Sequence, residues 1–190
     1  RVLRYKFDIT HDEFCSPQVY VDSDWGGCAK TRRSTSGCWL EVRGGRTCWP
    51  LTWSSNKQTA VSHSTPEAEV ISADRGLHQT LLPVLTLAET LLQGRFKSRK
   101  LFEDNEVAEE TLRSGKSKTM EVVLSRTHDI AVKATAETLK REEVNVYRAS
   151  SEEMKADIFT KPFTSALKWQ QSLRHVNVAK GLEGTSLAND

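Results

Sequence analysis

The sequence is poor in cysteine, and its cysteines stand far apart. Cys15, Cys28, Cys38 and Cys48 lie ten or more positions from one another, and no two of them form a C-x-x-C pair. Structural zinc sites usually take closely spaced ligands, so this spacing argues against one. We see no secretory signal that would imply an oxidising compartment, and we therefore expect free, buried thiols.

Long apolar runs and a strong net charge are also missing. No hydrophobic stretch reaches the roughly 20 residues of a membrane-spanning helix, so we expect no membrane partner. The net charge is only +2 at pH 7, which by itself does not indicate a nucleic-acid-binding protein. The hydrophobic share of 37% over 190 residues is ordinary for one globular domain. Composition alone leaves the function open.

The positive charge that is present is unevenly spread. Residues 26–58 contain six basic side chains and a single acidic one, Glu41, and a second basic run follows at residues 95–100. Such runs are usually solvated surface. Next to a group of carboxylates they can instead hold phosphates.

The most informative stretch is residues 20–25, where apolar residues give way to Asp22 and Asp24. The two aspartates are spaced by two positions, so they share one face of a predicted strand. Neighbouring carboxylates are costly to bury unless a cation lies between them. Three further acids, Glu69, Asp104 and Asp157, stand near predicted element ends. We interpret the chain as a scaffold that gathers carboxylates around divalent metal.

The first half of the chain predicts an antiparallel meander. Strands are expected at 18–25, 38–42 and 48–53, with a hairpin turn at Gly44-Gly45. Pro50 cannot donate a ladder hydrogen bond, so its strand should be an edge strand or bulged.

The second half predicts alternating helices and strands. Ser64 and Glu67 resemble a capping box before helically spaced apolar residues, and Pro83 should kink or divide that helix. A strand at 101–104, helices at 106–112 and 130–141 and a strand at 144–147 follow. A last short helix, capped by Ser150, ends before Pro162. This order indicates an α/β fold with a mixed sheet.

We expect three regions along the chain. Residues 1–16 form a lead-in segment, residues 17–163 a domain, and residues 164–190 a polar, frayed C-terminal tail. The chain begins at Arg1 and not at methionine, which we interpret as a piece of a longer protein.

Six short motifs in one order resemble the ribonuclease H region of copia-type long-terminal-repeat retrotransposon polyproteins. They are Y-V-D-S-D-W-G at 20–26, R-S-T-S-G at 33–37, T-W-S-S-N-K-Q at 52–58, S-T-P-E-A-E at 64–69, E-D-N at 103–105 and A-D-I-F-T-K-P at 156–162. The resemblance implies a ribonuclease H-like fold: a five-stranded mixed sheet, made of a three-strand antiparallel meander plus two parallel strands, flanked by helices.

The resemblance also implies four catalytic, metal-binding acids, Asp22, Glu69, Asp104 and Asp157. Glu67 is the rival to Glu69, and the helix frame of the motif favours Glu69. Two Mg²⁺ ions, which Mn²⁺ can replace, are expected. Asp22 would bridge them, Glu69 and Asp104 would bind one, and Asp157 the other.

The implied activity is hydrolysis of the RNA strand of RNA–DNA hybrids during reverse transcription. The implied partner is the polymerase domain of the same polyprotein, in an intracellular setting, a cytoplasmic particle or the nucleus. Proteins read such hybrids through backbone shape and the 2′-hydroxyl. The candidate substrate contacts are Arg33, Ser34, Thr35, Ser64, Thr65, Asn105 and His128. We expect Trp39, Trp49 and Trp53 to lie in the core.

Several positions depart from the family pattern. The loop at 148–153 has no histidine, unlike many cellular ribonucleases H, and Glu106 stands where the family usually has glutamine. The alternative is therefore a catalytically weak or inactive module of a degenerate polyprotein, which binds hybrid or serves a structural role. A third reading is another polynucleotidyl transferase, such as an integrase core, against which the fourth acid, Asp157, argues.

Overall fold

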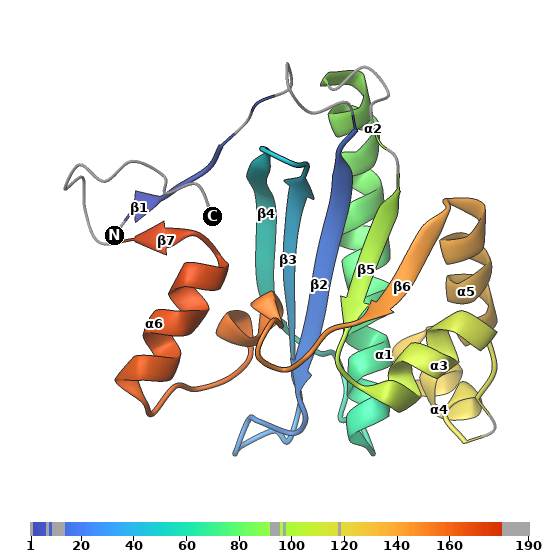
Figure 1. The fold of residues 1–190 in the computed structure, drawn as a ribbon. Coiled ribbons are helices and arrows are strands. Elements are labelled where there is room, and N and C mark those ends of the chain that lie inside the picture. Colours follow the sequence, from blue (N-terminus) through green and yellow to red (C-terminus); the bar gives the residue numbers. More distant parts are fainter. Residues whose placement is uncertain are drawn as a thin grey trace.

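The computed structural model describes residues 2–6, 8, 14–91, 96, 98–117 and 119–179. A five-stranded sheet with the order β4-β3-β2-β5-β6 forms its centre (Figure 1). β2 pairs antiparallel with β3, β3 antiparallel with β4, and β5 parallel with both β2 and β6. The expected mixed sheet is confirmed. The strands are β2 (Ser16–Asp24), β3 (Thr35–Arg43), β4 (Cys48–Lys57), β5 (Arg99–Glu103) and β6 (Val144–Arg148).

Pro50 lies in an edge strand, at an irregular position of its pairing. β4 is an edge strand, and its register with β3 shifts between Leu40 and Glu41, which face Thr52 and Pro50. A proline without an N–H group disturbs such a position least. The expectation of an edge or bulged strand at Pro50 is confirmed.

One long helical stretch packs along the sheet. It consists of α1 (Thr65–Arg75), a π-helical turn (Gly76–Leu81) and α2 (Leu82–Leu91). The Leu82 N–H donates to Leu77 O, five residues back, just before Pro83. Because Pro83 has no N–H to continue the α-helical pattern, the wider turn divides the helix as expected.

Three further helices gather beside β6 (Figure 1). They are α3 (Glu106–Ser114), α4 (Glu121–His128) and α5 (Val132–Arg141). α3 and α5 were expected, with α5 beginning two residues later than the expected start at Ile130. α4 was not expected, because the residue at its start, Met120, offers no side-chain cap.

Each face of the sheet has its own apolar core. Val19 and Val21 of β2 pack with Ala73 and Leu77 of the long helical stretch on one face. On the other face Tyr20 and Trp39 pack with Met154, Ala156 and Val176. Successive strand residues point to opposite faces, so both β2 faces are buried around Asp22. The sheet end that carries Asp22 is therefore held rigidly.

The expectation of a frayed tail is wrong for residues 166–179. α6 (Ala166–His175) is capped by the Ser165 hydroxyl, and β7 (Val178–Ala179) pairs with β1 (Val2–Leu3). Residues 180–190 lie outside the described residues. Before α6, a short 3-10 helix, η2 (Lys155–Phe159), packs against the sheet and carries Asp157.

All four cysteines are free, as expected. Cys15 and Cys38 are buried, whereas Cys28 and Cys48 are partly exposed, so burial of all four was wrong. Among the described residues, no helix combines the length and the apolar character needed to cross a membrane.

Candidate active site

Asp22 and Asp104 meet because of strand direction. Asp22 lies near the carboxyl end of β2, and Asp104 directly follows β5. β2 and β5 are parallel neighbours, with Tyr20 opposite Phe102, so their carboxyl ends lie at the same edge of the sheet. Asp22 is 1% exposed and Asp104 is half-buried.

Glu69 reaches the same place from α1. The Ser64 hydroxyl accepts the Glu67 N–H and so begins the helix. The Ser72 hydroxyl donates to Asp22 O at 2.7 Å and ties α1 to β2. These contacts point the second turn of α1 at the end of the sheet, where Glu69 is 3% exposed.

The three acids form one compact group. One carboxylate oxygen from each of Asp22, Glu69 and Asp104 lies within 4.8 Å of the other two. The structure thus brings together three of the four acids expected from the sequence. Among the described residues, it places Glu69 and not its rival Glu67 in this group.

Burial and mutual repulsion raise the pKa of the buried acids Glu69, Asp22 and Glu103. Burial, then the charges of Glu103, Asp22 and Asp104, raise the pKa of Glu69 to about 11. Burial raises the pKa of Asp22 to about 6, against the opposing effect of Lys161 and Thr160. Glu103, which is fully buried, has a pKa raised well above its usual value, mainly by burial. A cation would relieve this excess of buried negative charge.

The donor atoms fit a divalent cation. Within the described part of the chain, Glu69 Oε2 and Glu103 Oε2 are buried without a hydrogen-bond partner. Buried polar atoms of this kind usually have a partner, so their state suits a missing ligand. Carboxylate oxygens are the ligands that magnesium, manganese and calcium prefer.

Asp157 lies beside this group but outside it, as far as the described residues show. It sits on η2, and the Lys161 ammonium lies between it and Asp22, 2.7 Å from Asp157 Oδ1 and 3.2 Å from Asp22 Oδ1. The close packing of this segment depends on Gly37, which pairs with Asp22 in the sheet. A Cβ atom at Gly37 would lie 2.6 Å from Thr160 Cγ2.

The candidate substrate residues after β2 differ in their exposure. Ser34 is fully buried, and its hydroxyl accepts the Gly26 N–H at 3.0 Å. Thr35 donates its N–H and its hydroxyl to Asp24, so both groups are engaged within the turn. Arg33 is half-buried and donates to Thr59 O at 3.4 Å. Of the three, only Arg33 offers a cationic group near the surface.

Two of the three remaining helix-start candidates, Ser64 and Asn105, are capping residues. Ser64 caps α1, Thr65 is its half-buried first residue, and the Asn105 side chain caps α3 by accepting the Ala108 N–H at 3.1 Å. The Asn105 N–H donates to Glu103 Oε1 at 3.0 Å. Asn105 thus holds the backbone on either side of Asp104.

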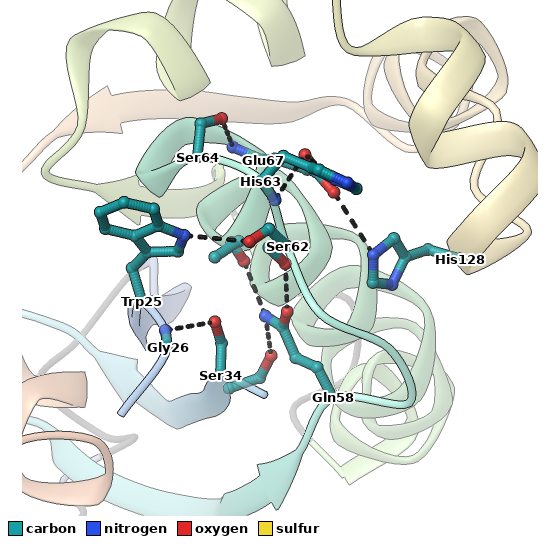
Figure 2. Close-up of polar contacts among 11 residues, drawn as sticks. Trp25, Gly26, Ser34, Gln58, Ser62, His63, Ser64, Glu67 and His128 are labelled. Atoms are coloured by element: carbon teal, nitrogen blue, oxygen red, sulfur yellow. Dashed lines mark hydrogen bonds and ion pairs between the residues drawn. The ribbon is translucent and has the colours of Figure 1, made fainter. Parts of the chain in front are cut away.

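His128 lies in a group of polar side chains next to the first turn of α1 (Figure 2). Its side chain is 1% exposed, and Nε2 lies 3.4 Å from Glu67 Oε1. Glu67 also accepts the His63 N–H at 3.0 Å, which closes the capping box at His63 and not at Ser64. Figure 2 further shows Gln58 joined to Ser62 and the Trp25 indole reaching Ser62 O. This position favours a packing role for His128 over a substrate contact.

The structure also shows the surroundings of Glu106, which departs from the family pattern, and of the three tryptophans expected in the core. Glu106 is exposed and pairs with Arg148 at 3.1 Å, so a cation already partly compensates its charge. Among the tryptophans, Trp39 is buried and Trp49 half-buried, but Trp53 is 52% exposed and stacks over Trp39. The core placement expected for Trp53 is therefore wrong.

No model of a known protein family matches the chain. The chain is 41% identical over 76 residues to the uncharacterized mitochondrial protein AtMg00810 of Arabidopsis thaliana, covering 36% of this chain and 30% of that protein. It is 36% identical over 62 residues to secreted RxLR effector protein 161 of Plasmopara viticola, covering 33% of this chain and 41% of that protein. The chain thus spans less than half of either relative.

One solved structure shares the fold of this chain over about three quarters of its length. LC11-RNase H1, isolated from compost by a metagenomic approach, superposes with a TM-score of 0.51 at 12% identity, over 76% of this chain and 92% of that one. The chain has a ribonuclease H-like fold. The N-terminal ribonuclease H domain of Rv2228c from Mycobacterium tuberculosis gives a TM-score of 0.48 at 15% identity, over 76% of this chain and 90% of that one.

Sequence reasoning missed three polar side chains around the acids of this ribonuclease H-like domain. Glu103 adds a buried carboxylate beside Asp104, and the Thr160 hydroxyl donates to Asp22 Oδ2. Lys161 contacts two of the expected acids. The four-residue spacing of Asp157 and Lys161 was a signal for the last of these, because such a spacing places side chains together on a helical turn.

Proposed function

We propose that this domain hydrolyses the RNA strand of RNA–DNA hybrids with the help of divalent metal ions. The observation that carries the proposal is the convergence of Asp22, Glu69 and Asp104 from β2, α1 and the end of β5. The fold alone does not decide the function, since one fold can serve many reactions. The buried, mutually repelling acids at one edge of the sheet supply the chemical argument.

Each acid has a defined task in this proposal. Asp22, Glu69 and Asp104 would hold a first cation, and Asp22 and Asp157 would hold a second. Bound Mg²⁺ or Mn²⁺ would supply an activated water and would stabilise the leaving oxygen. The protein itself contributes no covalent nucleophile. Its part is to fix the carboxylates through the Ser72 contact to Asp22 O and the Asn105 cap beside Asp104.

Substrate recognition falls to groups that surround this edge. Arg33 offers a guanidinium near the surface, and Thr65 stands on the first turn of α1, one turn before Glu69. Such groups would contact phosphates and the 2′-hydroxyls that distinguish RNA from DNA. The motif order further supports a place in a copia-type retrotransposon polyprotein, with a polymerase domain as partner.

The proposal is tested with purified protein and a hybrid labelled on its RNA strand. We expect RNA cleavage that requires Mg²⁺ or Mn²⁺ and spares duplex DNA. Asp104→Asn should lower the rate about a thousandfold, because it removes a charged ligand from the metal group. Asp129→Asn, a matched change at an exposed aspartate, should keep full activity. Absence of metal-dependent cleavage by folded wild-type protein would contradict the proposal.

The alternative, a catalytically weak or inactive hybrid-binding module, has one observation in its favour. Asp157 is held by Lys161 and lies outside the group of three acids that the described residues form. In that case the protein binds hybrid without turnover, and Asp104→Asn leaves binding unchanged. Measuring hybrid affinity beside the cleavage rate separates the two functions.

A further inference from the structure

Lys161 makes contacts that the proposed reaction does not explain. Its ammonium lies 2.7 Å from Asp157 Oδ1 and 3.2 Å from Asp22 Oδ1. The same turn sends the Thr160 hydroxyl to Asp22 Oδ2. Thr160 thus hydrogen-bonds one oxygen of Asp22, and Lys161 forms an ion pair with the other, for which the described residues offer no hydrogen bond.

The Lys161 ammonium contacts one oxygen of Asp22 and one of Asp157. A second ion shared by these two carboxylates would need the same oxygens. A lysine ammonium is charged at neutral pH, so Lys161 brings a positive charge to the two carboxylates. Its side chain is 39% exposed, so it has a way out into solvent.

We propose that Lys161 is a resident counter-ion for Asp22 and Asp157, and that a metal ion must displace it to bind between them. This inference rests on the proposed function, because it takes Asp22 and Asp157 as metal ligands. Lys161 is a positioning residue: it holds the two carboxylates together in the metal-free protein and sets how strongly they bind a second ion.

The two proposed ions should then differ in affinity. The group of Asp22, Glu69 and Asp104 meets Lys161 only through Asp22. The pair of Asp22 and Asp157 meets it through both carboxylates. An ion at the pair competes with two ammonium contacts and binds more weakly. Removing the Lys161 ammonium should make the metal affinities of the two sites more similar.

The first experiment measures Mn²⁺ binding to the full chain without nucleic acid, by electron paramagnetic resonance of the free ion. We expect two classes of site in the wild type. Lys161→Met should tighten the weaker class about three- to tenfold, as expected for the loss of two partly exposed ion pairs. Lys161→Arg should keep the wild-type values. Lys140→Met, which removes the same charge from an exposed position of α5, is the matched control and should change neither class.

A second measurement uses the wild type alone, so it does not depend on the folding of a variant. Reductive methylation labels free lysine amines, and mass spectrometry reports the rate at each lysine. Saturating Mg²⁺ should speed labelling of Lys161 because its amine is released, and should leave Lys140 unchanged. Equal Lys161 rates with and without Mg²⁺ would overturn the inference. Unchanged or weaker Mn²⁺ binding in Lys161→Met would do the same.

These outcomes are distinct from failure of the proposed function. If Asp22→Asn and Asp104→Asn bind Mn²⁺ as the wild type does, these acids are not metal ligands and the proposed function fails. If both variants lose Mn²⁺ while Lys161→Met binds as the wild type does, the metal site stands and only the role of Lys161 is rejected.

Discussion

Two groups of buried charge lie on the same sheet, and they are built in opposite ways. Around Glu41 of β3, a single buried carboxylate is surrounded by donors. Around Asp22 of β2, several buried carboxylates face one another. Glu41 is fully buried and Asp22 is 1% exposed. The two carboxylates therefore differ in the charges around them and not in their burial.

The Glu41 group is internally matched. Glu41 accepts from Arg43 Nε at 2.7 Å and from Trp39 Nε1 at 2.8 Å, and it pairs with Lys155 of η2. Burial raises the pKa of Glu41, but Lys155 and Arg43 overcome this and lower it. This group therefore needs no further ligand, and it fastens η2 to β3.

Around Asp22, the buried acids outnumber the cations that the described residues place beside them, of which Lys161 is one. The pKa of Glu69 and of Asp22 rise, where that of Glu41 falls. The comparison teaches that burial alone does not indicate a metal site. A surplus of buried acid over buried base points to one, because such acids must either keep protons or bind an added cation.

The largest loss of stability should follow from removing the charge of Glu41. Glu41→Gln keeps the shape but leaves Lys155 and Arg43 without their carboxylate. We expect the free energy of unfolding to fall by about 3–5 kcal/mol, the usual cost of an uncompensated buried charge. Chemical denaturation measures it. Glu137→Gln, in the exposed pair with Lys133, is the control and should change stability little. Equal stability of Glu41→Gln and wild type would remove the basis of the comparison.

A smaller change, a gain in stability, is expected when the charge of Glu69 is removed. Glu69 holds its proton in the folded protein up to a pKa of about 11, against a usual value of 4.5. The folded state thus binds more protons than the unfolded state between these values, and the free energy of unfolding falls as pH rises. Without metal, Glu69→Gln should be stabilising by about 2–3 kcal/mol at pH 7 and nearly neutral at pH 4.

Denaturation curves at several pH values, recorded with a chelator, test this prediction. Glu110→Gln, at an exposed position of α3, should show the pH dependence of the wild type. Mg²⁺ should stabilise the wild type more than Glu69→Gln. A Glu69→Gln variant that is less stable than wild type at pH 7 would show that the acids are already balanced without metal.

The smallest effect concerns the outer partner of Glu41. Arg43 is 39% exposed, so water already screens its contact with Glu41. Arg43→Met should cost about 0.5–1 kcal/mol, since Lys155 continues to neutralise the carboxylate. Thermal denaturation at low and high salt measures it. A loss as large as that in Glu41→Gln would mean that Lys155 does not compensate the carboxylate by itself.

The three gathered acids were predictable because local rules place them. Asp22 and Asp104 follow apolar strand residues, and parallel strands bring their carboxyl ends to one edge. Glu69 was chosen over Glu67 by the helix frame of the family motif that the sequence resembles, while the Ser64 cap sets only where α1 begins. In these cases short-range patterns decide which way a side chain points.

The surroundings of Asp157 and the elements α4 and α6 could not be predicted in the same way. The contact of Lys161 with Asp22 joins residues 139 positions apart in a segment without strong periodicity. α6 buries none of its residues fully, so it has no clear apolar stripe to detect. Its Ser165 cap was the one usable signal. α4 has no side-chain cap at all.

Gly37 lies where β3 packs closely against the turn that carries Asp157. Its missing side chain leaves just enough room for Ala156 O and for the methyl group of Thr160. The smallest added group at this position would act as a wedge between β3 and the turn that carries Asp157. The spacing of Asp22 and Asp157 therefore depends on the hydrogen atom that Gly37 has in place of a side chain, beside Asp22 at the end of the sheet.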